Sequence, residues 1–237
     1  MNGFHRFPYR LAAILMFSLT SSVALGVLND TGQQDCYNST AVAECITVAA
    51  DTDSHPRQDA RFGRDAAAAA GELTKAGSGA AGFDFTKVCM SGELAGEGTC
   101  PANPTQGITA NEWACTKDNT TNLIWSLESR WSYYCSDYSG YITELNNSKR
   151  CGYDAGWRIP NRRELLSIVH YGTSSPAIDR NYFPSTHYKY GYYWTIDTYA
   201  PDGNWGWIVN FQNGSTTRGF KLNIQCYQRA VHNGPVN

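Results

Sequence analysis

The chain has 237 residues, of which 42% are hydrophobic and 17% charged, with eight cysteines, seven tryptophans and fifteen tyrosines. This composition excludes an intrinsically disordered protein, because such chains are poor in aromatic residues and rich in charge. The formal net charge of −2 argues against a general nucleic-acid-binding protein, which needs a basic surface to meet the phosphates.

The first 26 residues are predicted to be a secretory signal peptide. Arg6 and Arg10 supply its positive segment, residues 11–19 its apolar segment, and Ala24 and Gly26 the small residues of a cleavage site. Cleavage after Ala24 fits nearly as well. Nine strongly apolar residues are too few for a membrane span, which needs about 20. We therefore expect an exported protein without a membrane span.

All eight cysteines follow this segment, and an even number in an exported chain indicates disulfides. Zinc is disfavoured, because it prefers close Cys pairs or Cys with nearby His. Short loops with turn-forming residues favour Cys36–Cys45 and Cys89–Cys100. A predicted helix lies between Cys135 and Cys151 and favours their pairing, although spacing alone leaves the connectivity of the other four cysteines open. The predicted pairs are Cys36–Cys45, Cys89–Cys100, Cys135–Cys151 and Cys115–Cys226.

Residues 27–110 form an acidic N-terminal region, with 5 Lys/Arg against 11 Asp/Glu and hence a net charge of −6. A small disulfide-tied β-element is expected over 27–60. The Ala/Gly-rich stretch 65–82 fits either a short helix that leads into a linker or a contact surface for another subunit. Alternating apolar residues predict a short strand over 83–88, and residues 91–110 are typical of a loop.

A second domain is predicted over residues 111–232, followed by a tail at 233–237. Residues from 111 onward carry 12 Lys/Arg against 10 Asp/Glu, a net charge of +2, together with all seven tryptophans and thirteen of the fifteen tyrosines. Residues 123–125 indicate a strand and 137–148 a helix. A second helix is expected to begin at Asn161 as N-cap, with Glu164 closing a capping box, and to end at Gly172.

From residue 190 onward the pattern predicts β-structure. Alternation places Trp205, Trp207, Val209 and Phe211 on one face, which we interpret as buried. Asn213-Gly214 is typical of a two-residue type I′ hairpin turn, and Leu222, Ile224 and Cys226 alternate on the returning strand. The predicted fold class is α+β, with one or two helices packed on an antiparallel, aromatic-rich sheet.

Several ordered motifs of this domain resemble those of the Legionella-collagen-like-protein C-terminal domain family (Lcl_C). Residues 118–125 are similar to its DxxTGLxW opening, and residues 151–165 to its CGYxDWRLPxxxEL segment, with Gly156 and Ile159 as departures. The other matches are 176–184 (PAIDxxYFP), 193–195 (YWSS) and 207–214 (WxVNFxxG), whereas residues 228–230 depart from the usual terminal VRxV.

The resemblance implies a C-type-lectin-like or formylglycine-generating-enzyme-like fold in an exported bacterial protein. It further implies a role like that of a trimeric adhesin that binds sulfated polysaccharides. The departures from the motifs affect local turn geometry rather than the fold.

Catalytic chemistry finds little support in the sequence. The domain has His170, His187 and His232, but no Gly-x-Ser-x-Gly elbow and no His-Glu-x-x-His helix. The redox or copper chemistry of formylglycine-generating relatives needs free cysteines, and all eight can be paired here. The motifs of calcium-dependent lectins are also missing. We therefore expect no enzyme, no cofactor and no required metal.

Sugar binding is the function that the remaining residues favour. Saccharide faces stack on exposed aromatic rings, and sulfates bind Arg or Lys. The candidate ligand-binding residues are Tyr188, Tyr192, Tyr199, Arg218 and Lys221. We expect a non-catalytic binding module of the secreted or cell-surface kind, an adhesin for a glycan or another surface polymer. The alternative is a subunit of an extracellular filament, and either role predicts a homo-oligomer, as a trimer or a filament.

Overall fold

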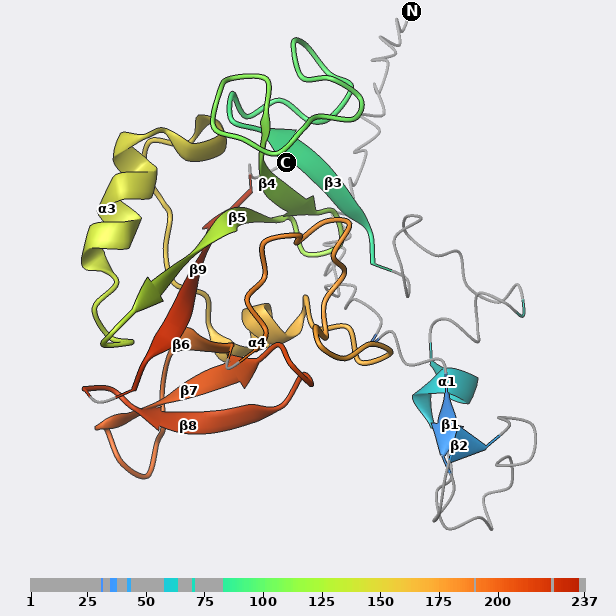
Figure 1. Ribbon diagram of the computed structural model, residues 1–237, viewed down its shortest axis with the longest axis vertical. Coiled ribbons are helices and arrows are strands. Elements are labelled where there is room, and N and C mark those ends of the chain that lie inside the picture. Colours follow the sequence, from blue (N-terminus) through green and yellow to red (C-terminus); the bar gives the residue numbers. More distant parts are fainter. Residues whose placement is uncertain are drawn as a thin grey trace, which may run out of the picture.

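The computed structural model describes residues 31, 35–37, 42–43, 58–63, 70, 83–189, 191–222 and 224–234. In the N-terminal region, strands β1 (Cys36–Tyr37) and β2 (Val42–Ala43) pair antiparallel, and a short helix α1 (Asp59–Phe62) follows. These elements lie to one side of the main domain (Figure 1). The signal segment and, apart from Ala70, the Ala/Gly-rich stretch 65–82 lie outside the described residues.

The main domain is built on a seven-stranded sheet with the strand order β3-β4-β5-β9-β6-β7-β8 (Figure 1). Two α-helices and one 3-10 helix are described between its strands, so the structure agrees with the predicted α+β class. The strands are β3 (Phe85–Cys89), β4 (Trp113–Asp118), β5 (Leu123–Ser132), β6 (Tyr192–Thr198), β7 (Trp205–Asn210), β8 (Thr216–Phe220) and β9 (Cys226–Asn233).

The sequence predicted an antiparallel sheet, but one pair of neighbouring strands is parallel. The C-terminal strand β9 lies between β5 and β6, antiparallel to β5 but parallel to β6, with Tyr193 opposite Tyr227. Strand β9 lies in the middle of the sheet, and the β7–β8 hairpin occupies the outer edge beside β6. Two halves of the sheet that are distant in sequence are thereby joined.

Each face of the sheet has its own hydrophobic core. Adjacent residues of one strand fall in opposite clusters, such as Ile124 and Trp125 on β5 or Trp194 and Tyr193 on β6. Because successive side chains of a strand point to opposite faces, the two clusters cover the two faces. Tyr141 and Leu145 of the helix α3 (Ser139–Asn147) belong to one cluster and Leu165 of the helix α4 (Arg162–Leu166) to the other.

Helix α4 begins at the predicted position, and α3 begins two residues after the predicted start at residue 137. Helix α3 spans Ser139–Asn147, and α4 spans Arg162–Leu166. The capping box is confirmed, because Asn161 accepts from the Glu164 amide at 2.9 Å and Glu164 accepts from the Asn161 amide at 2.8 Å. Helix α4 ends at Leu166 and does not continue to Gly172, although Ile168 and Val169 are still buried in the segment that follows.

The sheet extends N-terminal to residue 111, where the sequence placed the start of the domain. Strand β3 pairs with β4, with Phe85 opposite Asp118. Phe83 and Phe85 are buried in the core, and the ring of Phe85 meets that of Phe183 edge-on at 5.3 Å. The last part of the acidic region therefore contributes an edge strand to the main sheet.

The β7–β8 hairpin has a longer turn than the predicted Asn213-Gly214 dipeptide. Val209 pairs with Thr216, and the Gly214 amide donates to the Asn210 carbonyl at 2.8 Å. Phe211 leaves the strand between these points and is fully buried, edge-on to Tyr193 at 4.9 Å. The register of the hairpin therefore follows the burial of the Phe211 ring rather than the turn preference of Asn213-Gly214.

Three disulfides lie within the main domain. The predicted Cys89–Cys100 bond is confirmed. The predictions Cys135–Cys151 and Cys115–Cys226 are wrong, since Cys115 is bonded to Cys151 and Cys135 to Cys226. The insertion of β9 beside β5 explains the difference, because Ser132 on β5 lies opposite Cys226 and brings the nearby Cys135 to it. Cys36 is also disulfide-bonded, and its predicted partner Cys45 lies outside the described residues.

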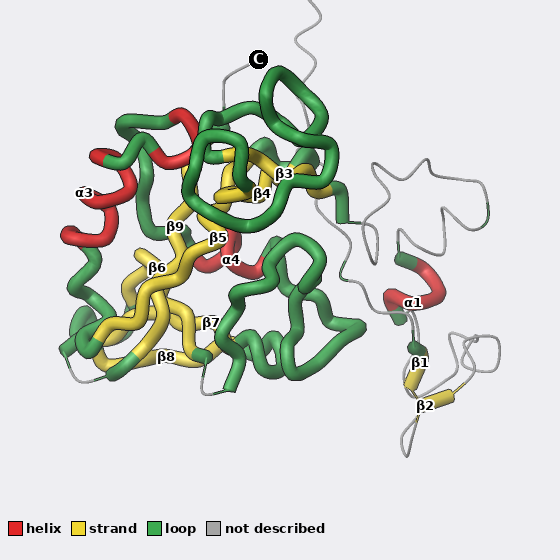
Figure 2. The backbone as a smooth tube through the Cα atoms, turned by 45° about the horizontal axis from the view of Figure 1, so that its top comes forward, coloured by secondary structure: helices red, strands yellow, loops and turns green. Residues whose placement is uncertain are grey.

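Long loops complete the domain. The segments between β3 and β4 and between α4 and β6 run over the sheet largely without regular structure (Figure 2). Among the described residues, no helix is both long and apolar enough to cross a membrane.

Candidate functional site: an aromatic–cationic face and a polar pocket

Guanidinium groups lie over aromatic rings on one face of the β7–β8 hairpin. The guanidinium carbon of Arg162 lies 4.2 Å from the ring centre of Trp207. That of Arg218 lies 5.0 Å from the ring centre of Tyr199 and 5.2 Å from that of Trp205. We call these five residues the aromatic–cationic face.

The sheet register and one helix start bring these side chains together. Trp207 on β7 lies directly opposite Arg218 on β8, and opposite residues of an antiparallel pair share a face. Arg162 is the first residue of α4, and its amide donates to the Asp197 carboxylate at 2.7 Å. This bond fixes the helix start against β6, so that Arg162 can reach Trp207.

The prediction that Trp205 and Trp207 are buried in the core is wrong. Both side chains are half-buried, whereas Val209 on the same face is fully buried. The physical reason is where α4 begins. Its first residue, Arg162, lies over Trp207, whereas Trp205 meets the exposed Arg218 of β8 instead.

The structure brings together some of the predicted ligand-binding residues and separates others. Tyr199 and Arg218 belong to the face, and Lys221 lies at its border, where its Nζ donates to Thr198 Oγ1 at 2.9 Å. Tyr192 lies elsewhere and lines a cavity of about 480 Å³. Tyr188 is half-buried in the loop before β6.

Other exposed residues were not among the sequence candidates. Phe220 is one of them, and its ring lies 5.4 Å from that of Trp205. The half-buried Arg162 was not a candidate either. The alternation along residues 205–211 was recognised in the sequence. Had the register of the β7–β8 hairpin also been known, it would have placed Phe220 opposite Trp205 and Arg218 opposite Trp207. No local signal marks the cluster of exposed rings Trp131, Tyr133 and Tyr134, which lies at the end of β5 and just beyond it.

The chemistry of the aromatic–cationic face suits an anion that also carries an apolar surface. A cation over an exposed ring gains about 0.5–1 kcal/mol and is held in one orientation. The planar guanidinium keeps donors for a sulfate or carboxylate, which it can bind with two parallel bonds. The half-buried rings offer flat surfaces for stacking beside those donors.

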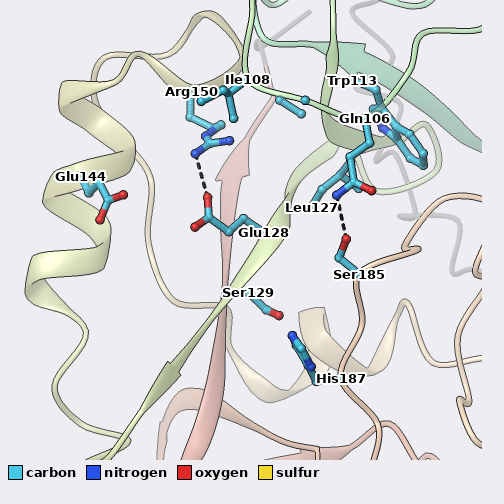
Figure 3. Close-up of a pocket in the computed structure, with 12 residues that line it drawn as sticks. Gln106, Ile108, Trp113, Leu127, Glu128, Ser129, Glu144, Arg150, Ser185 and His187 are labelled. Atoms are coloured by element: carbon cyan, nitrogen blue, oxygen red, sulfur yellow. Dashed lines mark hydrogen bonds and ion pairs between the residues drawn. The ribbon is translucent and has the colours of Figure 1, made fainter.

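A separate polar pocket of about 510 Å³ lies between β5, α3 and two loops (Figure 3). Figure 3 shows an Arg150–Glu128 pair at one side, a Gln106–Ser185 pair at the other, and Ser129 and His187 below them. Glu144 of α3 also lines the pocket, and its carboxylate pairs with Arg130 at 3.1 Å. The apolar part of the lining comes from Ile108, Trp113, Ala114 and Leu127.

Tyr141 holds the backbone of a residue that lines this pocket. Burial raises the pKa of its hydroxyl to about 12, so the group stays protonated even in strongly alkaline solution. It donates to the backbone carbonyl of Glu128 at 2.8 Å. In the part of the chain that the structure describes, no group of three or more His, Cys, Asp or Glu is arranged to hold a metal ion.

The comparisons with known proteins concern the same domain. The family model described as the Lcl C-terminal domain matches residues 114–232, from β4 to β9 and just over half of the chain. No curated protein matches the chain.

Proposed function

The chain belongs to the Lcl C-terminal domain family, and from this premise we propose that it is an exported, non-catalytic binding protein whose aromatic–cationic face binds a polyanionic glycan. The observation that carries the proposal is the pair of guanidinium groups held over three half-buried rings, at 4.2 to 5.2 Å. Stacked rings and oriented guanidinium groups are suited to binding rather than to nucleophilic chemistry. The proposed setting is the bacterial cell surface or its exterior, and the proposed fold is C-type-lectin-like.

Two sources of affinity act together on this face. Saccharide rings have apolar C–H surfaces that pack on aromatic rings, and sulfate groups accept charge-assisted hydrogen bonds from Arg162 and Arg218. The net charge of +2 over residues 111–237 helps to attract a polyanion, whereas the −6 of residues 27–110 opposes it. Binding is therefore expected to depend on these local cations and to weaken with salt.

The experiment measures retention of the mature protein on heparin over a salt gradient, with Arg162→Ala and Arg218→Ala as test variants. Each is expected to weaken binding roughly tenfold, since a hydrogen bond to a charged group contributes about 1.5–3 kcal/mol. Arg163→Ala is the matched control, because Arg163 is the exposed neighbour of Arg162 on the same helix. No retention at low salt, or an equal effect of Arg163→Ala, would contradict the proposal.

A structural role through self-association is the second candidate. Ile196, Phe220 and Leu222 are exposed by 47%, 36% and 66% at the end of the sheet whose edge strand is β8. Exposed apolar side chains beside an unpaired edge favour contacts between copies. Light scattering of the purified protein separates the two: filaments or large assemblies favour the structural role, and a monomer or trimer that binds heparin favours the adhesin.

A further inference from the structure

The polar pocket of Figure 3 has the size and the rigidity of a ligand site. Its volume of about 510 Å³ falls within the range of about 300–1,000 Å³ that is usual for small-molecule pockets. It lies over β5 and α3, whereas the aromatic–cationic face lies on β7 and β8. The two sites are therefore separate and can be altered independently.

One wall is an ion pair that the backbone holds in place. The side chain of Arg150 is only 8% exposed, and its Nη2 donates to Glu128 Oε2 at 2.9 Å. The residues on either side, Lys149 and Cys151, have left-handed backbone angles of φ 50° and 52°. The Cys115–Cys151 disulfide ties this turn to β4. Arg150 is thus positioned before any ligand arrives, which lowers the entropy that binding must overcome.

The guanidinium of Arg150 keeps donors for a ligand. Among the described residues Nη2 has a hydrogen-bond partner and Nη1 has none, so Nη1 is the donor left for a ligand, whereas Nε is buried out of a ligand's reach. The Glu128 side chain is half exposed, so its carboxylate still has acceptor capacity beside the guanidinium.

The opposite wall of the pocket is formed by Gln106 and Ser185, which together also offer a ligand one hydrogen-bond donor and one acceptor. Gln106 Nε2 donates to Ser185 Oγ at 2.7 Å, which joins two loops that are 79 residues apart in sequence. The Gln106 loop is held by backbone bonds to Trp113, from the Trp113 amide to the Thr105 carbonyl at 2.8 Å and from the Gly107 amide to the Trp113 carbonyl at 3.1 Å. The amide oxygen of Gln106 and the hydroxyl hydrogen of Ser185 remain for a ligand.

From these walls we propose that the pocket binds a neutral saccharide unit. Each hydroxyl of a sugar both donates and accepts, so neighbouring hydroxyls match the paired donor and acceptor of Arg150–Glu128 and of Gln106–Ser185. The carboxylates of Glu128 and Glu144 are paired with Arg150 and Arg130, so the charges at the pocket cancel and favour neither an anion nor a simple cation. Ile108, which is exposed in the lining, supplies apolar contact for the C–H surface of the ring.

The test uses the whole mature protein and five neutral sugars as probes: glucose, galactose, mannose, fucose and N-acetylglucosamine. Glucuronate is the anionic comparison. Binding is measured by saturation-transfer NMR and by titration. We expect at least one neutral sugar to bind with a dissociation constant in the millimolar range, which corresponds to a free energy of about −4 kcal/mol.

Two pocket variants and two matched controls locate the binding. Gln106→Ala and Glu128→Gln are each expected to weaken the binding of that sugar about fivefold, the usual effect of one lost hydrogen bond. Gln212→Ala and Glu97→Gln change exposed residues outside the pocket and are expected to leave it unchanged. Gln106 is itself exposed, so Gln106→Ala keeps the test valid should Glu128→Gln destabilise the fold.

The proposal is overturned if no neutral sugar binds, if glucuronate binds as well as the neutral sugars, or if both pocket variants keep full binding. Arg218→Ala distinguishes this site from the polyanion site, because it is expected to weaken heparin binding and to spare sugar binding. Sugar binding without any heparin retention would contradict the polyanion proposal alone.

Discussion

The guanidinium carbon of Arg229 lies 5.1 Å from the ring centre of Phe183, and both side chains are fully excluded from solvent. The ring of Tyr193 lies 5.6 Å from the same group, and Nη2 donates to Thr186 Oγ1 at 2.9 Å. Nε and Nη1 have no hydrogen-bond partner in the described part of the chain. The core of the domain therefore holds a cation that is stabilised mainly by aromatic rings.

Replacement of Arg229 by two residues of similar length should give opposite results. Arg229→Met removes the buried charge, and we expect unfolding free energy to stay equal or to rise by about 1–4 kcal/mol, as when other buried charges are replaced by apolar side chains. Arg229→Lys keeps the charge without the planar group and should lower stability by about 3 kcal/mol. Urea denaturation measures both, and a larger loss in Arg229→Met than in Arg229→Lys would contradict the interpretation.

Gly206 is required by the packing of Trp194. A Cβ at Gly206 would overlap the Trp194 ring, whose edge lies against the backbone of β7. Gly206→Ala is therefore expected to lower stability by about 1–3 kcal/mol, the usual effect of overpacking, and to change the tryptophan fluorescence. Gly203→Ala is the matched control, because its Cβ would meet no atom within 4 Å. Equal thermal midpoints for the two variants would show that Trp194 can move aside.

The disulfide connectivity can be tested by peptide mapping. Digestion of the non-reduced protein should yield linked peptides for Cys115–Cys151 and for Cys135–Cys226. The latter bond joins residues 91 apart, against 11 for Cys89–Cys100. In the chain-entropy model their removal costs about 4.6 and about 2.8 kcal/mol, respectively. Paired Ser substitutions should therefore destabilise the protein more at 135 and 226 than at 89 and 100, and the reverse order would contradict this ranking.

The stability of the domain should fall in mild acid because of His232. Burial lowers the pKa of this ring below its usual 6.5, and Arg158 lowers it further. The folded protein then binds the proton less readily than the unfolded chain, so this stabilisation is complete above pH 6.5 and declines as the pH falls below it.

His232→Phe keeps an aromatic ring to stack on Tyr153, whose ring centre lies 3.9 Å from that of His232, but removes the group that takes up the proton. The urea midpoint of this variant should change less than that of the original protein between about pH 7.5 and pH 5.5. His187→Phe is the control, since His187 stacks in the same way on Tyr227 at 4.4 Å. An unchanged pH profile in His232→Phe would assign the acid sensitivity to other groups.

What the sequence by itself determined was local. The capping box of Asn161 and Glu164, the existence of α3 and the short Cys89–Cys100 loop all follow from residues close in sequence, whose contacts do not depend on how distant segments pack. The ordered motifs of residues 118–214 were also sufficient to identify the family that the comparison shows.

The tertiary structure alone decided what depends on which distant segments become neighbours. The insertion of β9 between β5 and β6 set the Cys135–Cys226 bond, and the position at which α4 begins left Trp205 and Trp207 half-buried. The polar pocket draws on Gln106 and Ser185, which lie 79 residues apart. The alternation of residues along a strand predicts which face of the sheet a side chain is on, but not which other element packs against that face. That depends on how distant segments pack together, and both proposed sites depend on it as well.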